Sequence, residues 1–158
     1  MKYQTSNLKE KLTFFCATGC YVGLIPIISG TFGSAAGLVL CYFFSLMKIK
    51  TAVTGIFFFI LFSIWVADKT EKITKQKDPG CIVIDEYAGM LVTLLGLQFT
   101  WTSAVAGFFI FRFFDILKPF PIRNIEKKLP GGAGVVLDDV LAGVFSNITL
   151  RIILFFFV

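Results

Sequence analysis

An uncharged run over residues 12–47 constrains this chain more than any other feature of its sequence. As a single helix the run would be about 54 Å long, whereas the hydrocarbon core of a bilayer is roughly 30 Å thick. One proline and two glycines interrupt it near the middle. The sequence therefore predicts two apolar helices, over 12–25 and 34–47, joined by a turn over 27–33 that leaves Ser34 as an N-cap.

Three further apolar runs follow. They cover 51–67, 87–111 with a polar turn at 98–100, and 140–158, which Arg151 interrupts. Over the whole chain 56% of residues are hydrophobic and 16% are charged, against about 25% charged residues in soluble domains. A chain of this composition would expose many apolar side chains, and such a surface suits a bilayer better than water. We therefore predict an all-α fold, a multi-pass membrane helical bundle of four to six apolar helices, several of them short, forming a single domain over 1–158.

The residue types that the chain lacks exclude several kinds of catalytic and metal site. The chain has no histidine, which excludes Ser-His-Asp and Cys-His nucleophile pairs, histidine-ligated zinc and a phosphohistidine. Its four cysteines form no CxxC pair, so we expect no disulfide framework. The net charge of +5 comes without a basic strip interleaved with aromatic residues, and we expect no nucleic-acid partner. In a membrane protein, such an excess of lysine and arginine orients the helices and attracts anionic lipid.

Polar residues interrupt the apolar sequence in three segments, and the first is 26–34. Gly30, Thr31 and Ser34 belong to a glycine-rich turn that opens an apolar helix. Free backbone amides and the positive end of the helix dipole suit a phosphate at such a place. An ordinary turn between helices, with a cap, explains the same residues.

The second segment, 78–86, begins with an Asp-Pro-Gly turn and ends with two adjacent carboxylates, Asp85 and Glu86, with apolar sequence on both sides. Acidic residues at a helix start gain about 0.3–1 kcal/mol from the helix dipole, which is one explanation for the pair. A buried metal or proton site is the other, because a charge at membrane depth costs roughly 2.5–3.5 kcal/mol. A similar pair, Asp138 and Asp139, stands at the start of the last apolar run.

The third segment, 111–139, is the longest. Arg112, Asp115 and Lys118 recur every third residue and share one side of a helix, where Asp115 can pair with either basic neighbour. A Lys-Pro-Phe-Pro sequence then ends the helix, and Arg123 adds a further cation. These cations supply positive charge that suits a phosphate.

The three segments together indicate more than any one of them. Two acidic pairs and Asp115 make a set of carboxylates that would repel one another in one apolar site. A hard divalent cation removes that repulsion, and Mg²⁺ or Mn²⁺ fits a ligand set without histidine. With the cations nearby, the sequence predicts a metal-assisted phosphate site at a membrane surface.

Alternating membrane crossings would bring all three segments to one side. That side would carry nine basic residues against six on the other, which favours a cytoplasmic position for the loops of the active site. If the first apolar run lies in the interface instead of crossing, the N-terminus joins the same side.

Four segments of the chain resemble bacterial phosphatidylglycerophosphatase A. They are PIISGTFGS at 26–34, IVIDEYAGM at 82–90, FRFFDILKPFPI at 111–122 and GGAGVVLDDVLAG at 131–143. Their order and spacing match the family, although relatives often have proline at the position of Ser29. The resemblance implies a Mg²⁺-dependent phosphatase of the bacterial inner (cytoplasmic) membrane. Its substrate would be the phospholipid phosphatidylglycerophosphate, converted with water to phosphatidylglycerol and phosphate in the last step of phosphatidylglycerol synthesis.

The resemblance also implies roles at the matching positions. The implied metal ligands are Asp85, Glu86, Asp115, Asp138 and Asp139, of which Asp85, Glu86 and Asp139 are also the implied catalytic residues. The implied phosphate-binding residues are Arg112, Lys118, Arg123, Gly30, Thr31 and Ser34, with the backbone amides of residues 30–34.

Other interpretations lie outside this family. A small ion or proton transporter would use the carboxylates as a relay, but a relay needs them near the middle of the membrane. In a structural membrane subunit they would be helix caps and salt-bridge partners, and no single Asp→Asn change would abolish activity. CDP-alcohol phosphotransferases also use membrane carboxylates, but their series of aspartates on consecutive helical turns is absent here.

Overall fold

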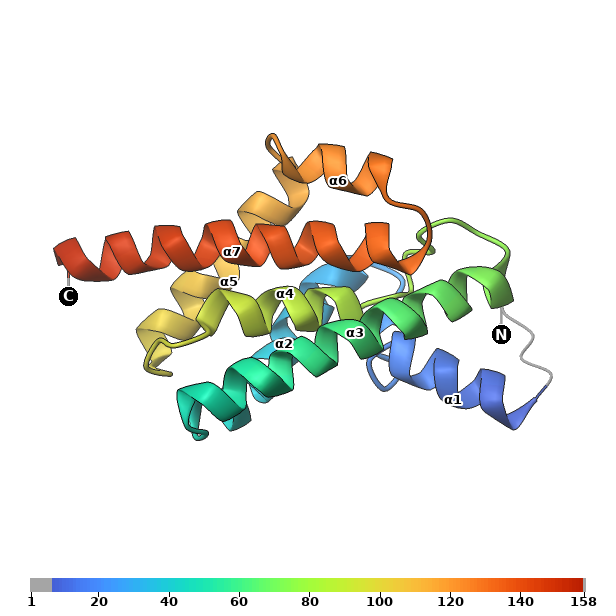
Figure 1. The fold of residues 1–158 in the computed structure, drawn as a ribbon, viewed down its shortest axis with the longest axis horizontal. Helices are drawn as coiled ribbons and strands as arrows, with labels where there is room; N and C mark the ends of the chain where they lie inside the picture. Colours follow the sequence, from blue (N-terminus) through green and yellow to red (C-terminus); the bar gives the residue numbers. More distant parts are fainter. Residues whose placement is uncertain (1–6, 158) are drawn as a thin grey trace.

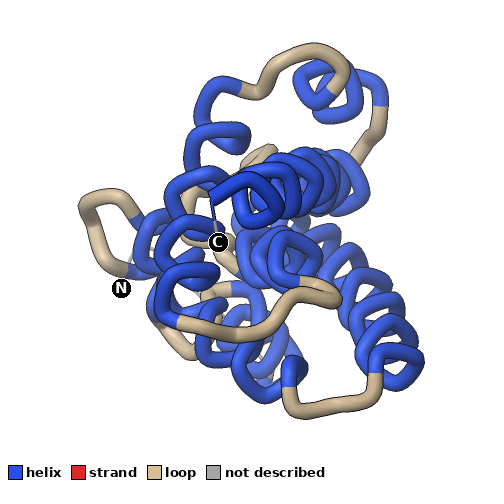
Figure 2. The backbone as a smooth tube through the Cα atoms, turned by 90° about the vertical axis from the view of Figure 1, so that its left-hand side faces the viewer, coloured by secondary structure: helices blue, strands red, loops and turns tan. Residues whose placement is uncertain are grey.

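The computed structural model describes residues 7–157, and within this range the chain consists of helices and loops without a strand (Figure 2). The helices are α1 (Leu8–Ala17), the short 3-10 helix η1 (Val22–Leu24), α2 (Ser29–Ser45), α3 (Ile49–Thr74), α4 (Ile84–Leu94), α5 (Trp101–Leu117), α6 (Ile122–Lys128) and α7 (Gly132–Phe157). The predicted all-α fold class is confirmed.

Helix α4 is the centre of the fold, in contact with α2, α3, α5 and α7 (Figure 1). It is buried along most of its length, including Ala88, Met90 and Leu91. Glycines allow its close approach to α7, because a Cβ atom at Gly143 would meet the carbonyl oxygen of Gly89. A short helix enclosed in this way can hold polar side chains away from lipid and water.

The C-terminal end of α4 is held by side chains of α7. The Asn147 amide donates hydrogen bonds to the carbonyl oxygens of Val92, Thr93 and Leu95, at 3.2, 2.8 and 3.0 Å. Arg151 donates to the Leu95 carbonyl at 2.9 Å and to the Asn147 side chain at 2.8 Å. Carbonyl groups left open at a helix end in apolar surroundings need such partners. These bonds explain how α4 can end after 11 residues.

The exterior of the bundle is apolar. Large hydrophobic side chains are exposed on several helices, among them Phe43 of α2, Phe58 of α3, Phe109 of α5 and Phe155 of α7. Two of the described helices, α3 and α7, are long and apolar enough to cross a membrane. Helix α2 is apolar but shorter. A surface of this kind is stable where lipid replaces water.

Connections between helices lie at both ends of the bundle. The α2–α3 and α4–α5 connections lie at one end with the C-terminus, on the left of Figure 1. The α3–α4 and α6–α7 connections lie at the other end, where α1 packs against the last part of α3. The predicted turn at 98–100 is confirmed between α4 and α5, where Thr100 and Ser103 cap each other's backbone amides.

Two predicted helix boundaries near the N-terminus are wrong. Helix α1 ends at Ala17, and residues 19–21 have positive φ angles before η1, so no helix runs over 12–25. Helix α2 begins at Ser29, and Ser34 lies inside it, donating to the Gly30 carbonyl at 2.7 Å, instead of capping it. The glycines of this segment serve packing: a Cβ atom at Gly33 would lie 2.8 Å from the Cβ of Val83.

Candidate functional site

A small polar cavity lies where the three polar segments of the sequence meet. Its volume is about 150 Å³. The residues that line it are Ser29, Asp78, Gly80, Ile82, Asp85, Glu86, Asp115, Lys118, Val135, Asp138 and Asp139. They come from the start of α2, the α3–α4 connection, the start of α4, the end of α5 and the first turns of α7. The expected convergence of the three segments is therefore confirmed.

Three carboxylates of the cavity form a tight cluster. One oxygen each of Asp85, Glu86 and Asp139 lies within 4.8 Å of the other two. Asp85 and Asp139 are 7% and 4% exposed. Glu86 Oε2 is buried and has no hydrogen-bond partner among the described residues. Three acidic groups this close, one with an unsatisfied oxygen, can hold a divalent cation.

The electrostatics of Asp85 and Glu86 follow from their position at the start of α4, outside the two candidate membrane spans. Burial raises the pKa of Glu86 well above its usual range, and the neighbouring Asp85 carboxylate adds to this effect. Burial also raises the pKa of Asp85. A bound cation would oppose both shifts, because it favours the ionised carboxylates.

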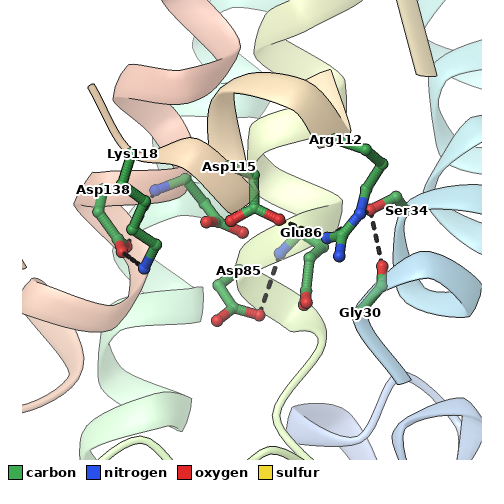
Figure 3. A network of polar contacts seen from close by, with 9 residues as sticks. Gly30, Ser34, Asp85, Glu86, Arg112, Asp115, Lys118 and Asp138 are labelled. Carbon is green, nitrogen blue, oxygen red and sulfur yellow. Dashed lines mark hydrogen bonds and ion pairs between the residues drawn. The ribbon is translucent and has the colours of Figure 1, made fainter. Parts of the chain in front are cut away.

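Cations flank the carboxylates on two sides, as Figure 3 shows. On one side, Arg112 forms an ion pair with Asp115, and its Nη1 atom lies 3.5 Å from the Ser34 hydroxyl. On the other side, Lys118 forms an ion pair with Asp138. Asp115 thus pairs with one of its two predicted basic neighbours, Arg112, whereas Lys118 follows the end of α5 at Leu117 in a left-handed backbone conformation and reaches Asp138 of α7.

Asp138 and Asp139 lie about two turns inside α7 and not at its start, as the sequence had suggested. The helix begins at Gly132, where the missing side chain lets α7 pack on the α3 backbone: a Cβ atom there would meet the carbonyl of Ile64. These first two turns of α7 bring Asp139 of the second acidic pair next to Asp85 and Glu86 of the first.

Comparison with known proteins identifies the family. A family model for phosphatidylglycerophosphatase A matches residues 15–154. The chain belongs to the phosphatidylglycerophosphatase A family. No solved structure matches the chain.

Relatives cover most of the chain. A phosphatidylglycerophosphatase A from Haemophilus influenzae is 38% identical over 136 residues, which span 85% of this chain and 83% of that protein. The phosphatidylglycerophosphatase A of Escherichia coli is 37% identical over 82% of this chain and 76% of its own length. A Bacteroides thetaiotaomicron protein with the provisional name phosphatidylinositol-3-phosphatase is 34% identical over 89% of this chain and 92% of its own length.

Some residues singled out in the phosphatidylglycerophosphatase A motifs lie beside the cavity or away from it. Gly30 and Ser34 are next to Arg112 at the edge of the cavity. Thr31 is half-buried in the first turn of α2 and does not line the cavity, and Arg123 is exposed on α6. The expected cradle of amides from 30 to 34 is wrong in part, because the amides of Thr31 and Phe32 already donate to the Ile28 carbonyl.

Sequence reasoning missed Ser29, Asp78 and Gly80, which also line this cavity. The Ser29 hydroxyl donates to the Gly80 carbonyl at 2.7 Å, which ties the start of α2 to the α3–α4 connection. The Asp78 amide donates to Glu71 at 2.7 Å. All three residues belong to the polar segments that interrupt the apolar sequence, and this position could have indicated that they are part of the site.

Proposed function

We propose that this chain is a membrane lipid phosphatase that hydrolyses phosphatidylglycerophosphate to phosphatidylglycerol and phosphate, the last step of phosphatidylglycerol synthesis. The main observation behind this proposal is the polar cavity with its clustered carboxylates, which lie between Arg112 and Lys118 (Figure 3) in a chain of this family. The carboxylates suit a cation and the basic groups suit a phosphate. The two relatives named phosphatidylglycerophosphatase A support the same substrate.

The chain's residues fit a hard divalent cation, which we propose is Mg²⁺. Asp85, Glu86 and Asp139 would hold it, and the cation would be a partner for the buried Glu86 oxygen that has none among the described residues. All the donors are carboxylate oxygens, the ligand type that Mg²⁺ prefers. When bound, the ion would polarise the phosphoryl group and lower the pKa of a nearby water. Asp115 and Asp138 border this cluster as the remaining proposed ligands.

Arg112 and Lys118 are the proposed phosphate-binding groups. Each is now paired with a carboxylate, Arg112 with Asp115 and Lys118 with Asp138. A guanidinium group has further donors, so Arg112 can keep Asp115 and still bind a phosphate oxygen. Asp115 and Asp138 would thus hold the two cations at the edges of the cavity until the substrate binds. Arg123, Thr31, Gly30 and Ser34 stay predictions as members of the phosphate site.

We place the protein in the bacterial inner membrane as a multi-pass protein. Helices α3 and α7 would cross it, and α2 and α5, of 17 residues each, would be about 25 Å long, close to the core thickness. The end with the cavity carries most of the basic residues, including Lys69, Lys72 and Lys128, whereas the other end carries Lys48, Lys50 and Arg151. The positive-inside rule then puts the cavity on the cytoplasmic side.

The position of α1 strengthens this orientation. It has 10 residues, about 15 Å as a helix, which is too short to cross the bilayer. It packs at the end with the cavity, so Lys9 and Lys11 join the basic side. The interpretation that the first apolar run lies in the interface is thereby favoured over a crossing. Family membership also favours the phosphatase over the ion or proton transporter.

Phosphate release from defined lipids tests the proposed reaction. Purified protein in detergent micelles with Mg²⁺ is expected to release phosphate from phosphatidylglycerophosphate and to yield phosphatidylglycerol, as seen by mass spectrometry. The Glu86→Gln variant, purified in parallel, controls for contaminating phosphatases. Release from phosphatidylinositol 3-phosphate alone would contradict the proposal and would assign the activity in the third relative's name.

A substitution at Gly30 tests whether activity depends on the exact positions of the Glu86 and Arg112 side chains. A Cβ atom there would meet Glu86 Oε1 and would lie 3.1 and 3.3 Å from two nitrogens of the Arg112 guanidinium. We expect Gly30→Ala to fold normally, because both neighbours are ends of flexible side chains, and to lose about 10- to 100-fold in kcat/KM by displacing them. Ala35→Val adds methyl groups at an exposed position of the same helix and is the control. Unchanged kcat/KM in Gly30→Ala would show that these side chains do not need their present positions.

A further inference from the structure

A second cavity, separate from the polar one, lies in a groove between α1 and α3. Its volume is about 650 Å³, within the roughly 300–1,000 Å³ of ordinary ligand sites. Its apolar walls come from Leu12, Phe62, Trp65, Val66 and Ile73. None of its lining residues lines the polar cavity. Thus this groove is not part of the phosphatase site.

The groove changes in character along its length. Lys9 at the start of α1 and Lys69 and Lys72 near the end of α3 supply its basic part. Apart from Ile73 beside Lys72, the large apolar residues Leu12, Phe62 and Trp65 line it farther from those helix ends. Because α1 runs alongside the last turns of α3 (Figure 1), the charged part faces the end of the bundle and the apolar part faces its middle.

The balance of charge in the groove is positive. Glu10 also lines the groove, and Asp68 of α3 pairs with Lys72 at 2.6 Å. Three lysines line the groove against one acidic residue. A ligand that fits must therefore have a negatively charged head at the membrane surface and an apolar tail that points into the bilayer.

We propose that the groove between α1 and α3 binds a phospholipid with an anionic headgroup. An acyl chain lies against Leu12, Phe62 and Trp65, and the phosphate lies near Lys9, Lys69 and Lys72. Basic residues near a membrane surface attract anionic lipids. The groove adds an apolar slot beside them, so the lipid is held at a defined place and not only in a diffuse layer. The lipid would fix α1 against α3 at the membrane surface.

Trp65 offers a direct probe, since it lines the groove and is 53% exposed. The chain has two tryptophans, and the other, Trp101, is 84% exposed at the start of α5, at the opposite end of the bundle. In a Trp101→Phe background, Trp65 is the sole tryptophan. Its fluorescence is measured as lipids with brominated acyl chains, which quench on contact, are added to the protein in micelles. Brominated phosphatidylglycerol is compared with brominated phosphatidylcholine of the same chains.

We expect phosphatidylglycerol to quench Trp65 with an apparent affinity about tenfold above that of phosphatidylcholine. The double variant Lys9→Gln/Lys69→Gln should lose this preference. Lys75→Gln/Lys77→Gln removes the same charge from exposed lysines of the neighbouring connection, outside the groove, and should keep it. Trp101, probed alone in a Trp65→Phe background, should show no preference.

Equal quenching of Trp65 by the two lipids would overturn the proposal. So would an equal loss of preference in both double variants, because attraction to the overall positive charge would then suffice. Displacement of the brominated lipid by glycerol 1-phosphate would overturn the role of the acyl chain. Because no substrate turnover is measured, failure here leaves the proposed phosphatase activity untouched.

Discussion

Glu86→Gln is expected to lower kcat/KM for phosphatidylglycerophosphate by at least about a hundredfold, the size of loss seen when one preorganised electrostatic group is removed from an active site. Glu86 lies in the cluster with Asp85 and Asp139, and its Oε2 atom has no partner among the described residues. An amide in its place offers a weaker, neutral ligand to a cation. Phosphate release from micellar substrate measures the effect.

The stability of the same variant separates a lost ligand from a damaged fold. Burial and the Asp85 carboxylate raise the pKa of Glu86, so ionised Glu86 is costly in the protein without a metal ion. Glu86→Gln should therefore show an unchanged or higher Tm in EDTA. Asp68→Asn removes a carboxylate from a partly exposed pair with Lys72 and should keep activity. Full activity in Glu86→Gln would remove this residue from the metal site.

Gly143→Ala is expected to destabilise the bundle strongly, although the same change inside an isolated helix stabilises it by about 1 kcal/mol. A Cβ atom at Gly143 would meet the Gly89 carbonyl oxygen and lie 3.1 Å from the Cβ of Val92. These neighbours belong to the rigid α4 backbone or its first side-chain atom and cannot move aside, so α4 and α7 must separate. We expect a net loss of about 2 kcal/mol or more, typical of overpacking.

Thermal unfolding in detergent measures this loss. Gly80→Ala is the matched control, since a Cβ atom at Gly80 has no neighbour within 4 Å, and its Tm should stay close to that of the parent protein. Because α4 carries Asp85 and α7 carries Asp139, Gly143→Ala should also weaken activity. A higher Tm for Gly143→Ala would mean that helix propensity outweighs packing and would contradict the close α4–α7 contact.

Apolar runs in the sequence predicted the existence of most helices but not all their limits. The polar residues at 98–100 predicted the turn between α4 and α5, and the structure shows that they act locally, because Thr100 caps α5 together with Ser103. The glycines of segment 26–34 were misread as a turn. They lie inside α2, where Gly33 and Gly37 allow Val83 and Met90 to come close. Glycine that breaks a helix and glycine that packs one against another look alike in a single sequence.

The charged residues of the site were predicted from their cost in an apolar chain. This reasoning selected two acidic pairs and Asp115, and the fold brings three of these five carboxylates, Asp85, Glu86 and Asp139, within 4.8 Å of one another. It did not find the partners that only the tertiary structure brings together. Lys118 pairs with Asp138 because α5 ends one residue earlier, and Ser29 reaches Gly80 across 51 residues of sequence. Such contacts depend on helix ends, which a sequence pattern fixes only within a few residues.

The most direct test of the central claim is phosphate release from phosphatidylglycerophosphate by the purified protein, first in EDTA and then with Mg²⁺ restored. Asp139→Asn, which changes another carboxylate of the cluster, is measured beside it. The account predicts no release in EDTA, recovery of the parent protein with Mg²⁺, and no recovery of Asp139→Asn at the same concentration. Undiminished release in EDTA would contradict a metal-assisted reaction at this cavity.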